Sequence, residues 1–398
     1  MLLKHEKLLS GRIIVRQEFL VCGMILPKRK EKRTKMRQNN REWRQSGTAS
    51  AGPKKVAVLF GGCSPEYGVS LQSAAAVISH MDREKYEPVP VGITHMGDWF
   101  YYGGEPAEIA DDTWCLGGGC VPATVSLNRS APGLLLWKEE GVERMEIDAA
   151  FPVLHGRNGE DGTVQGLFEL AGIPVAGCGI LSSALCMDKD RAHRLVKEAG
   201  VKVPVSRVYG KDADKTKLLR QAEQIGYPLF VKPVRSGSSY GITKAGDQNE
   251  LLKAIELAFS YDERMIMEES ISGFEVGCAV LGTEELTVGE VDEIELSEGF
   301  FDFTEKYTLK TSAIHVPARI SAETAEKIKE TAKTIYRALD CRGFARVDMF
   351  LSKEGEIVFN EVNTIPGFTT HSRFPNMMKA AGISFQQVIS TILEEALR

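Results

Sequence analysis

The sequence lacks any long hydrophobic segment. Its longest apolar run near the amino terminus extends from Phe19 to Leu26, well short of the roughly 18 residues that a membrane-spanning helix needs. A secretory signal is not expected either, because no cleavage-site pattern follows this run. With 43% hydrophobic and 26% charged residues, the chain has the composition of a soluble globular protein. We therefore expect a cytoplasmic location and no membrane partner.

Several common site motifs are also missing. The eight cysteines include no C-x-x-C pair, and no His/Cys spacing typical of a zinc site occurs. This pattern favours reduced thiols in packing roles. No G-x-x-x-x-G-K-[ST] segment occurs, so a Walker-type P-loop is excluded. The sequence also shows no internal repeat and no low-complexity segment.

Charge is distributed unevenly along the 398 residues. The net charge is −5, but residues 1–55 contain 15 Lys/Arg and 4 Asp/Glu, so the remainder carries −16. A basic tail of this kind can bind nucleic acid or anionic lipid. The basic run Lys28–Arg37 has no aromatic residue to stack on bases, however. We therefore expect residues 1–53 to be a disordered leader without a role, or to result from an upstream translation start, with Met36 as a plausible true start. No nucleic-acid partner is expected.

The remaining length is enough for two or three domains, and the local patterns indicate α/β modules. An apolar run, Lys55–Phe60, leads through two glycines into a helix expected over Val69–Met81, which is the opening of a βαβ unit. Further strands are expected over 87–93, 149–154, 228–232 and 265–268, and helices over 163–171, 188–199, 250–260, 322–339 and 385–397. We expect an amino-terminal α/β domain over 54–177 and two further units over 178–268 and 269–398.

A hairpin expected over 345–362 carries the strongest chemical signal. A turn centred on Glu354 and Gly355 would pair Asp348 with Glu361, whose Cβ atoms would then lie about 5 Å apart. Asn363 would point to the same side, since alternate strand residues share a face. Two carboxylates this close repel each other unless a cation lies between them, and Mg²⁺ prefers such hard oxygen ligands. A surface hairpin with solvated acids is the alternative.

Other segments are weaker signals. Lys232 ends a strand and runs into a Gly/Ser loop that contains Ser238 and Ser239, which could close over phosphate oxygens or could be an ordinary turn. Glu268 and Glu275 could accept from an adenine amino group or a ribose, or could lie on a solvated strand edge. Three glycines between 156 and 162, after His155, favour a close ligand approach.

One segment has the composition of a lid. Residues 300–307 mix aromatic and charged side chains in an expected loop, as a water-excluding lid would. A loop packed on a neighbouring element would have the same composition.

Together these segments resemble, in order and spacing, the D-alanine–D-alanine ligases of the ATP-grasp superfamily. The resemblance covers the chain from about Lys55 to its end and leaves out the leader. The matching motifs are Gly61-Gly62, Glu66, Val69-Ser70, His155-Gly156, Gly159-Glu160-Asp161-Gly162, Met187-Asp188-Lys189, Gly237-Ser238-Ser239, Glu305-Lys306-Tyr307, Arg346-Val347-Asp348, Glu361-Val362-Asn363-Thr364, Pro366-Gly367 and His371-Ser372. One departure is Gly68, where the family usually has a second acid, and this puts the hydrogen bonding near Ser70 in question.

The resemblance implies a three-domain ATP-grasp fold whose first domain is Rossmann-like, with ATP bound between the other two. Lys189, Lys232 and Ser239 would contact phosphates, and Glu268 and Glu275 the adenine and ribose. Two Mg²⁺ ions, or Mn²⁺, would be held by Asp348, Glu361 and Asn363.

The same resemblance assigns the D-amino acid site. Glu66 would bind the ammonium group of a first D-alanine, and His155 would lie near its carboxylate. Glu66, Ser238 and Tyr307 would form a hydrogen-bonded triad that ties the lid to the first domain.

The remaining implied roles concern catalysis. Arg346 and the backbone N–H of Gly367 would stabilise the tetrahedral oxyanion, a contribution of roughly 3–4 kcal/mol per donor in other enzymes. Lys306 would steady the acyl phosphate. Relatives of this family are commonly homodimers.

The second substrate is predicted from the lid motif and from the end of the chain. The resemblance favours an amine over D-lactate, because the lactate-specific enzymes replace Glu305-Lys306-Tyr307 with another loop. Arg373 follows Ser372, where D-alanine-specific enzymes usually have Leu or Met, and this looks like the vancomycin-resistance D-alanine–D-serine ligases (VanG type). A guanidinium can donate to a serine hydroxyl, so D-serine is expected. The alternatives are a D-alanine–D-alanine ligase, another ATP-grasp ligase, and a non-catalytic nucleotide sensor.

Overall fold

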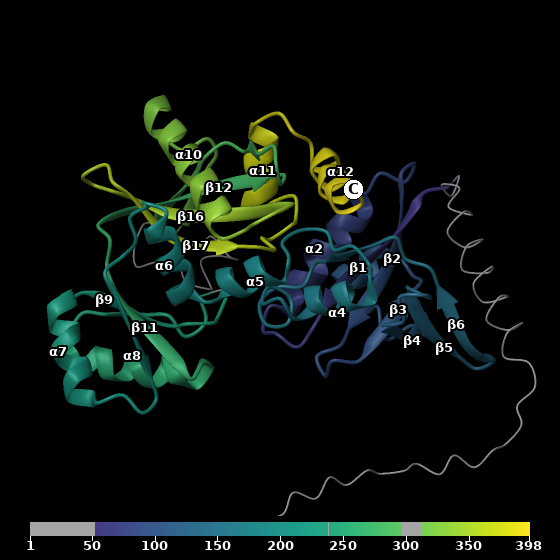
Figure 1. The fold of residues 1–398 in the computed structure, drawn as a ribbon, viewed down its shortest axis with the longest axis horizontal. Helices are drawn as coiled ribbons and strands as arrows, with labels where there is room; N and C mark the ends of the chain where they lie inside the picture. The colour runs from purple at the N-terminus through teal and green to yellow at the C-terminus, as the bar shows by residue number, and fades with distance from the viewer. Residues whose placement is uncertain (1–51, 238, 297–311) are drawn as a thin grey trace, which may run out of the picture. The chain divides into compact units, whose positions relative to one another are not determined.

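The structure is a computed structural model that describes residues 52–237, 239–296 and 312–398. Within this part of the chain three β-sheets follow one another in sequence order, each with its own helices (Figure 1). The mixed α/β architecture expected from the sequence is confirmed. The domain boundaries at 177 and 268 stay predictions, although the first and third sheets fall within their expected ranges and the second exceeds its range by one residue, Glu269.

The first sheet has seven strands in the order β6-β5-β4-β3-β2-β1-β7. Its strands and helices are β1 (Lys54–Gly61), α2 (Tyr67–His80), β2 (Tyr86–Ile93), β3 (Trp99–Tyr102), α3 (Pro106–Ala110), β4 (Cys120–Val125), β5 (Leu134–Lys138), β6 (Gly141–Met145), β7 (Ala149–Pro152) and α4 (Thr163–Ala171). The central β1 pairs in parallel with β2 and β7. This confirms the expected βαβ opening, whereas the antiparallel extension β3–β6 was not anticipated.

The turn after β1 requires glycine for two reasons. Gly61 and Gly62 have φ of +87° and +99°, a left-handed region that other residues rarely adopt. A Cβ on Gly61 would also lie 2.2 Å from the carbonyl oxygen of Ile93. The turn therefore brings the start of α2 close to the carboxyl end of β1, where the first substrate is expected.

The second sheet is antiparallel, in the order β10-β9-β11-β8. The elements of this region are α5 (Ile180–Met187), α6 (Lys189–Glu198), β8 (Ser206–Gly210), α7 (Lys215–Ile225), β9 (Leu229–Pro233), β10 (Thr243–Ala245), α8 (Gln248–Tyr261) and β11 (Arg264–Glu269). The carboxylate of Asp188 accepts a hydrogen bond from the backbone of Arg191 and so caps α6. This cap explains why the helix begins where the sequence pattern indicated.

The third sheet has the order β15-β14-β12-β16-β17, with β13 paired to β12. Its elements are β12 (Gly273–Leu281), β13 (Thr287–Val288), β14 (Asp292–Leu296), β15 (Ser312–His315), α10 (Ala322–Ala338), β16 (Phe344–Ser352), β17 (Ile357–Asn363), α11 (Arg373–Ala380) and α12 (Phe385–Ala396). Helix α11 was not expected, and its first residue is Arg373. No helix of the described ranges is both long and apolar enough to cross a bilayer.

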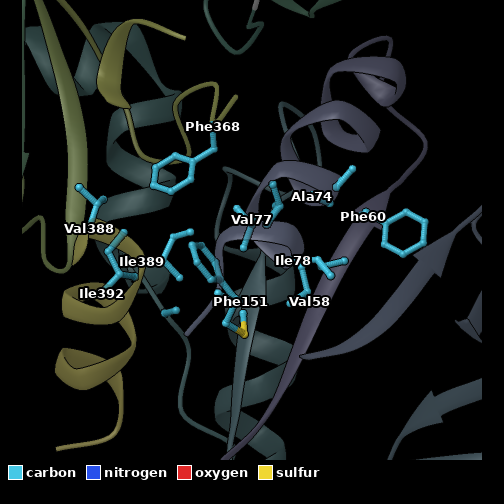
Figure 2. Close-up of a cluster of buried hydrophobic side chains, with 14 of the residues drawn as sticks. Val58, Phe60, Ala74, Val77, Ile78, Phe151, Phe368, Val388, Ile389 and Ile392 are labelled. Carbon is cyan, nitrogen blue, oxygen red and sulfur yellow. The ribbon is translucent and has the colours of Figure 1, made fainter. Parts of the chain in front are cut away.

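One apolar cluster joins the first sheet to the carboxyl-terminal helices. Figure 2 shows side chains of β1, α2 and β7 packed against Phe368 and α12. The ring of Phe368 lies 6.1 Å from that of Phe151, centroid to centroid, and is 1% exposed. The loop that follows β17 is thereby held against the first domain, next to the residues after β7.

Candidate active site

The hairpin β16–β17 brings together the three expected metal ligands, Asp348, Glu361 and Asn363. Asp348 is the direct cross-strand partner of Glu361, as the sequence predicted. Asn363 pairs with Arg346 one step along the same face. Asp348 is 1% exposed, so the alternative of a solvated surface hairpin is wrong.

The reason for this pairing differs from the one expected. Near its turn the hairpin pairs Leu351 with Ile357, so the turn is centred on Glu354 and not between Glu354 and Gly355. A register shift, a β-bulge, then occurs between Asp348 and Met349. The bulge inserts Asn360 as an extra residue and restores the pairing of Asp348 with Glu361. Asn360 and Glu361 consequently both line the same cavity.

The carboxylate of Asp348 is held by two neighbours. Arg346 donates from Nε to Oδ1 at 2.8 Å and from Nη2 to Oδ2 at 2.7 Å. Asn363 donates from Nδ2 to Oδ2 at 2.8 Å, which leaves its amide oxygen to face a cation. In the part of the chain that is described, no cluster of three His, Cys, Asp or Glu forms a metal site. Two carboxylates and an amide nevertheless fit Mg²⁺, which binds few protein groups and completes its shell with phosphate oxygens and water.

Two buried lysines lie beside these acids. Lys232 Nζ is 2.7 Å from Glu268 Oε2, and Lys189 Nζ is 3.8 Å from Glu361 Oε2. Burial disfavours the charge on Glu268, but Lys232, together with His193 and Lys189, offsets it and holds the pKa of Glu268 below its ordinary value. Burial likewise opposes the charge of Lys232, but Glu268, together with Glu361 and Glu275, offsets it and raises the lysine pKa. Both groups are therefore charged at neutral pH, and the lysines supply positive charge where phosphates are expected.

A single cavity of about 210 Å³ contains eight of the expected site residues that lie in the described part of the chain. Expected residues in its lining are Lys232, Ser239, Glu268, Glu275, Arg346, Asp348, Glu361 and Arg373. The cavity also has apolar walls, formed by Phe230, Ile242, Phe274 and Phe350. A flat, apolar base fits between such walls while charged groups contact its polar edges. The second and third sheets thus together form a site of the kind expected for a nucleotide.

The first-domain acid Glu66 is buried, at 6% exposure. It lies against two glycines, because a Cβ on Gly156 would be 2.1 Å from Glu66 Oε2 and one on Gly237 would be 3.1 Å from the same atom. The need for glycine in the segment after His155 is therefore explained by close approach to a carboxylate. The Gly/Ser loop that follows Lys232 therefore passes next to Glu66 at Gly237.

His155 and Ser70 fasten the loops around Glu66. His155 Nδ1 is 2.9 Å from the carbonyl of Ile365 and Nε2 is 3.2 Å from Ser73 Oγ. Since a carbonyl only accepts, Nδ1 carries the proton. Ser70 accepts from the backbone N–H of Gly61 at 2.9 Å and donates to the carbonyl of Val153. The hydrogen bonding near Ser70 is therefore intact despite Gly68.

Gly367 and Ser372 lie together at the end of the loop after β17. A Cβ on Gly367 would be 2.9 Å from Ser372 Oγ. Ser372 Oγ accepts from the backbone N–H of Thr369 at 3.0 Å. The loop is thus a compact turn that Ser372 closes by its contacts with Gly367 and Thr369.

Arg373 is buried and bonded to carboxylates, which excludes the solvent-exposed interpretation and leaves its role toward a second substrate a prediction. It does not point to solvent, since it is 6% exposed, and its donors are largely engaged by carboxylates. Nε and Nη2 donate to the two oxygens of Asp292, at 2.7 and 2.8 Å, and Nη1 donates to Glu275 at 2.8 Å. Nη2 also lies 3.4 Å from Asp348 Oδ1. Glu275, expected at the ribose, is therefore also an ion-pair partner of Arg373, and burial raises its pKa against the opposing effect of the arginine.

Three expected residues lie outside the described part of the chain. These are Ser238, Lys306 and Tyr307, together with the rest of the expected lid over 300–307 and the leader up to residue 51. Their assigned roles stay predictions.

Comparison with known proteins accounts for this arrangement. The family model described as D-ala D-ala ligase N-terminus matches residues 55–178, and the one described as D-ala D-ala ligase C-terminus matches residues 195–394. The chain belongs to the D-alanine–D-alanine ligase family. The ATP-grasp fold expected from the sequence motifs is thereby confirmed, as is the assignment of the chain to the ligases of this family.

Individual relatives of this ligase family differ in their second substrate. The crystal structure of the VanG D-Ala:D-Ser ligase from Enterococcus faecalis is 56% identical, with a TM-score of 0.81, covering 86% of this chain and 99% of that one. The vancomycin B-type resistance protein VanB of Enterococcus faecalis is 47% identical over 86% of this chain and 98% of its own length. A D-alanine–D-alanine ligase of Caldicellulosiruptor bescii is 44% identical over 86% and 95%. The family is therefore shown, and the second substrate is not fixed by similarity.

Two residues of the ligase site were missed by sequence reasoning. Asn360 lines the cavity because of a bulge, and strict strand alternation cannot anticipate a bulge. Asp292 is 0% exposed and binds Arg373 from a strand 81 positions away. Asp292 is one of several acids between Glu290 and Glu295, and nothing in this local pattern indicates which of them will meet a distant arginine.

Proposed function

We propose that this protein is an ATP-dependent D-alanine–D-serine ligase that works through D-alanyl phosphate and makes a peptidoglycan precursor dipeptide of the vancomycin-resistance type. The observation that carries the proposal is the buried pairing of Asp348 with Glu361 over a cavity that also holds Lys232 and apolar walls. The ligase chemistry follows from that pairing together with family membership. The choice of D-serine is supported by Arg373 and by the similarity to the VanG enzyme.

ATP would bind in the cavity of the second and third sheets. Glu268 Oε1 is buried without a hydrogen-bond partner among the described residues, so an adenine amino group would satisfy it. Lys189 and Lys232 would hold phosphates, with Ser239 from the loop. Two Mg²⁺ ions, or Mn²⁺, held by Asp348, Glu361 and Asn363 would offset the charge of the transferring phosphoryl group.

The first D-alanine would bind at Glu66, whose carboxylate pairs with an ammonium group. His155 holds the loop of Ile365 beside it, so the substrate carboxylate would be directed toward the γ-phosphate. Orientation of this kind replaces a bimolecular encounter with a positioned one. Phosphoryl transfer breaks the bond between the β,γ-bridging oxygen and the γ-phosphorus and forms one from phosphorus to a carboxylate oxygen, leaving ADP.

The second amino acid would then attack the acyl carbon with its amine. The tetrahedral oxyanion would accept from the backbone N–H of Gly367 and from Arg346, whose Nε and Nη2 are taken by Asp348, so that Nη1 faces the oxyanion. Collapse expels phosphate and leaves the peptide bond. Lys306 and the triad of Glu66, Ser238 and Tyr307 would exclude water from the acyl phosphate, which would otherwise be hydrolysed.

Recognition of D-serine would depend on Arg373, whose side chain is held in one orientation by two carboxylates. The bonds to Asp292 and Glu275 use three of the five N–H groups of Arg373. Nη2 also lies 3.4 Å from Asp348 Oδ1, so the second Nη1 hydrogen would donate to the hydroxyl. A site built around a hydroxyl loses a hydrogen bond when alanine binds in its place. We further propose that the enzyme acts in the cytoplasm as a homodimer.

The test is an incubation of the full chain with ATP, Mg²⁺ and an equal mixture of D-alanine and D-serine. Phosphate release and chromatographic identification of the dipeptide are measured together. D-Ala–D-Ser as the main product supports the proposal. D-Ala–D-Ala as the main product would assign a D-alanine–D-alanine ligase, and absence of phosphate in every mixture would indicate a nucleotide sensor instead.

A further inference from the structure

The bulge at Asn360 lies on an edge strand. Strand β17 is the last in its sheet, so its outer backbone groups have no neighbouring strand, and a bulge disrupts pairing further. Two groups outside the sheet compensate. The N–H of Phe359 donates to the carbonyl of Lys202 at 2.9 Å, and the carbonyl of Asn360 lies 3.2 Å from His193 Nε2. The bulge is therefore fastened on its outer side by a side chain from α6.

The geometry of His193 defines its protonation pattern at this contact. A carbonyl oxygen can only accept, so Nε2 must carry the hydrogen and donate it. The ring is 4% exposed and packs edge-on against Phe359, with centroids 5.5 Å apart. A buried ring with this packing has little freedom to rotate, and it therefore holds the Asn360 carbonyl in one direction.

Three further contacts link the side chain of Asn360 back to His193. Asn360 Oδ1 accepts from Lys232 Nζ at 3.4 Å, Lys232 pairs with Glu268 at 2.7 Å, and Glu268 Oε1 lies 3.8 Å from His193 Nδ1. The four residues come from α6, β9, β11 and β17. Both the backbone and the side chain of Asn360 are thus restrained by residues of the second sheet region.

The position of the bulge decides where Glu361 points. Up to Phe359, alternate residues of β17 face the apolar core. Without an extra residue at Asn360, strict alternation would turn Glu361 toward that core and away from Asp348. The bulge reverses the alternation, so that Val362 packs in the core and Glu361 lines the cavity.

We propose that His193 is a positioning residue for the metal ligand Glu361. Its Nε2–H holds the bulged carbonyl of Asn360, and the bulge keeps the Glu361 carboxylate opposite Asp348. This inference rests on the proposed function, because it assumes that Glu361 binds the catalytic cation. His193 itself contacts neither substrate nor metal, and it acts through the backbone of β17.

The test compares His193→Phe with His193→Gln. Phenylalanine fills the same volume and keeps the edge-on packing but donates nothing, whereas the glutamine amide nitrogen extends about as far as Nε2 and can donate. Free Mn²⁺ is measured by electron paramagnetic resonance in the presence of ADP, which requires no turnover. Phosphate release gives kcat and the KM for D-alanine.

His193→Phe should weaken Mn²⁺ binding and lower kcat, each by about 10-fold, as loss of a group that orients a metal ligand does. The KM for D-alanine should not change, and His193→Gln should restore both Mn²⁺ binding and kcat. If His193→Phe does not fold, His193→Asn replaces it, because its amide is too short to reach Asn360.

Three outcomes are distinguishable. Wild-type values in the donor-free variant, or equal losses in that variant and in His193→Gln, overturn the positioning role. A wild-type chain that binds Mn²⁺ in the presence of ADP but releases no phosphate with any D-amino acid overturns the proposed function, while the Mn²⁺ comparison still tests His193. Rescue confined to the glutamine variant supports the proposal.

Discussion

Arg373, the first residue of α11, and Asp292, the first residue of β14, form a bidentate ion pair. Both carboxylate oxygens of Asp292 accept a hydrogen bond from the guanidinium group. Asp292 is completely buried and Arg373 nearly so. Truncating one partner of such a pair leaves the other charge without compensation, at a cost of about 3–5 kcal/mol. Arg373 therefore stabilises the fold in addition to its proposed role in recognising D-serine, and an experiment has to separate these two contributions.

The first prediction separates them. Arg373→Leu alone should shift preference from D-serine toward D-alanine, but it should also lower the melting temperature. The double variant Arg373→Leu/Asp292→Asn removes the charge with its partner and should recover much of that stability. Its ratio of kcat/KM for D-serine over D-alanine should fall by about 10-fold or more, the effect of losing one charged hydrogen bond. A ratio equal to wild type in a folded double variant contradicts the role of Arg373 in specificity.

The second prediction concerns the metal ligands. Asp348→Asn and Glu361→Gln keep the shape of each side chain and remove its charge, so phosphoryl transfer should slow by about 100-fold, equivalent to about 2.7 kcal/mol. Affinity for a fluorescent ATP analogue should change much less, because the lysines and the apolar walls stay in place. Phosphate release measures the first quantity and a fluorescence titration the second. Unimpaired turnover in either variant would remove that residue from the metal site.

The third prediction uses the close contact between Gly156 and Glu66. Gly156→Ala places a methyl group on Glu66 Oε2 and should raise the KM for the first D-alanine. Gly355→Ala is the matched control, since Gly355 has a φ of +81°, close to the +71° of Gly156, but no atom within 4 Å of its Cβ. Both variants pay roughly 1–2 kcal/mol of left-handed backbone strain. If both raise the KM equally, displacement of Glu66 is not the cause.

The fourth prediction concerns pH. The pKa of Glu268 is below its ordinary value of 4.5 because Lys232, together with His193 and Lys189, offsets the effect of burial. Ionised Glu268 therefore stabilises the folded state fully above pH 4.5, and this stabilisation is lost as the pH falls through the lower folded-state value. The difference in unfolding free energy between wild type and Glu268→Gln, from urea titrations, should be constant from pH 7 to 5 and shrink below pH 4.5. A difference that stays flat into the acid range would mean that the glutamate pKa is not depressed.

Features of the fold and site that depend on residues close together in the sequence could be predicted, and contacts between distant residues could not. Strand alternation and a short turn place Asp348 near Glu361, because both lie in one hairpin whose periodicity is local. Near the turn the strand pairing differs by one residue from the predicted register, and a bulge restores the predicted pairing at Asp348. The apolar run before Gly61 likewise predicts a strand, glycine turn and helix, since each of these depends on neighbouring residues.

By itself, then, the sequence determined the α/β class, the family, and the residue types of the site. The tertiary structure alone decided which carboxylates surround Arg373 and that His193 contacts the bulged carbonyl of Asn360. Arg373 is 81 positions from Asp292, and His193 is 167 positions from Asn360. Hydrophobic periodicity encodes which face of an element is buried, but it carries no information about which distant charge or carbonyl will meet that face. Such pairs form only when the sheets and helices pack, because burial makes an unpaired polar group costly and so selects the partner.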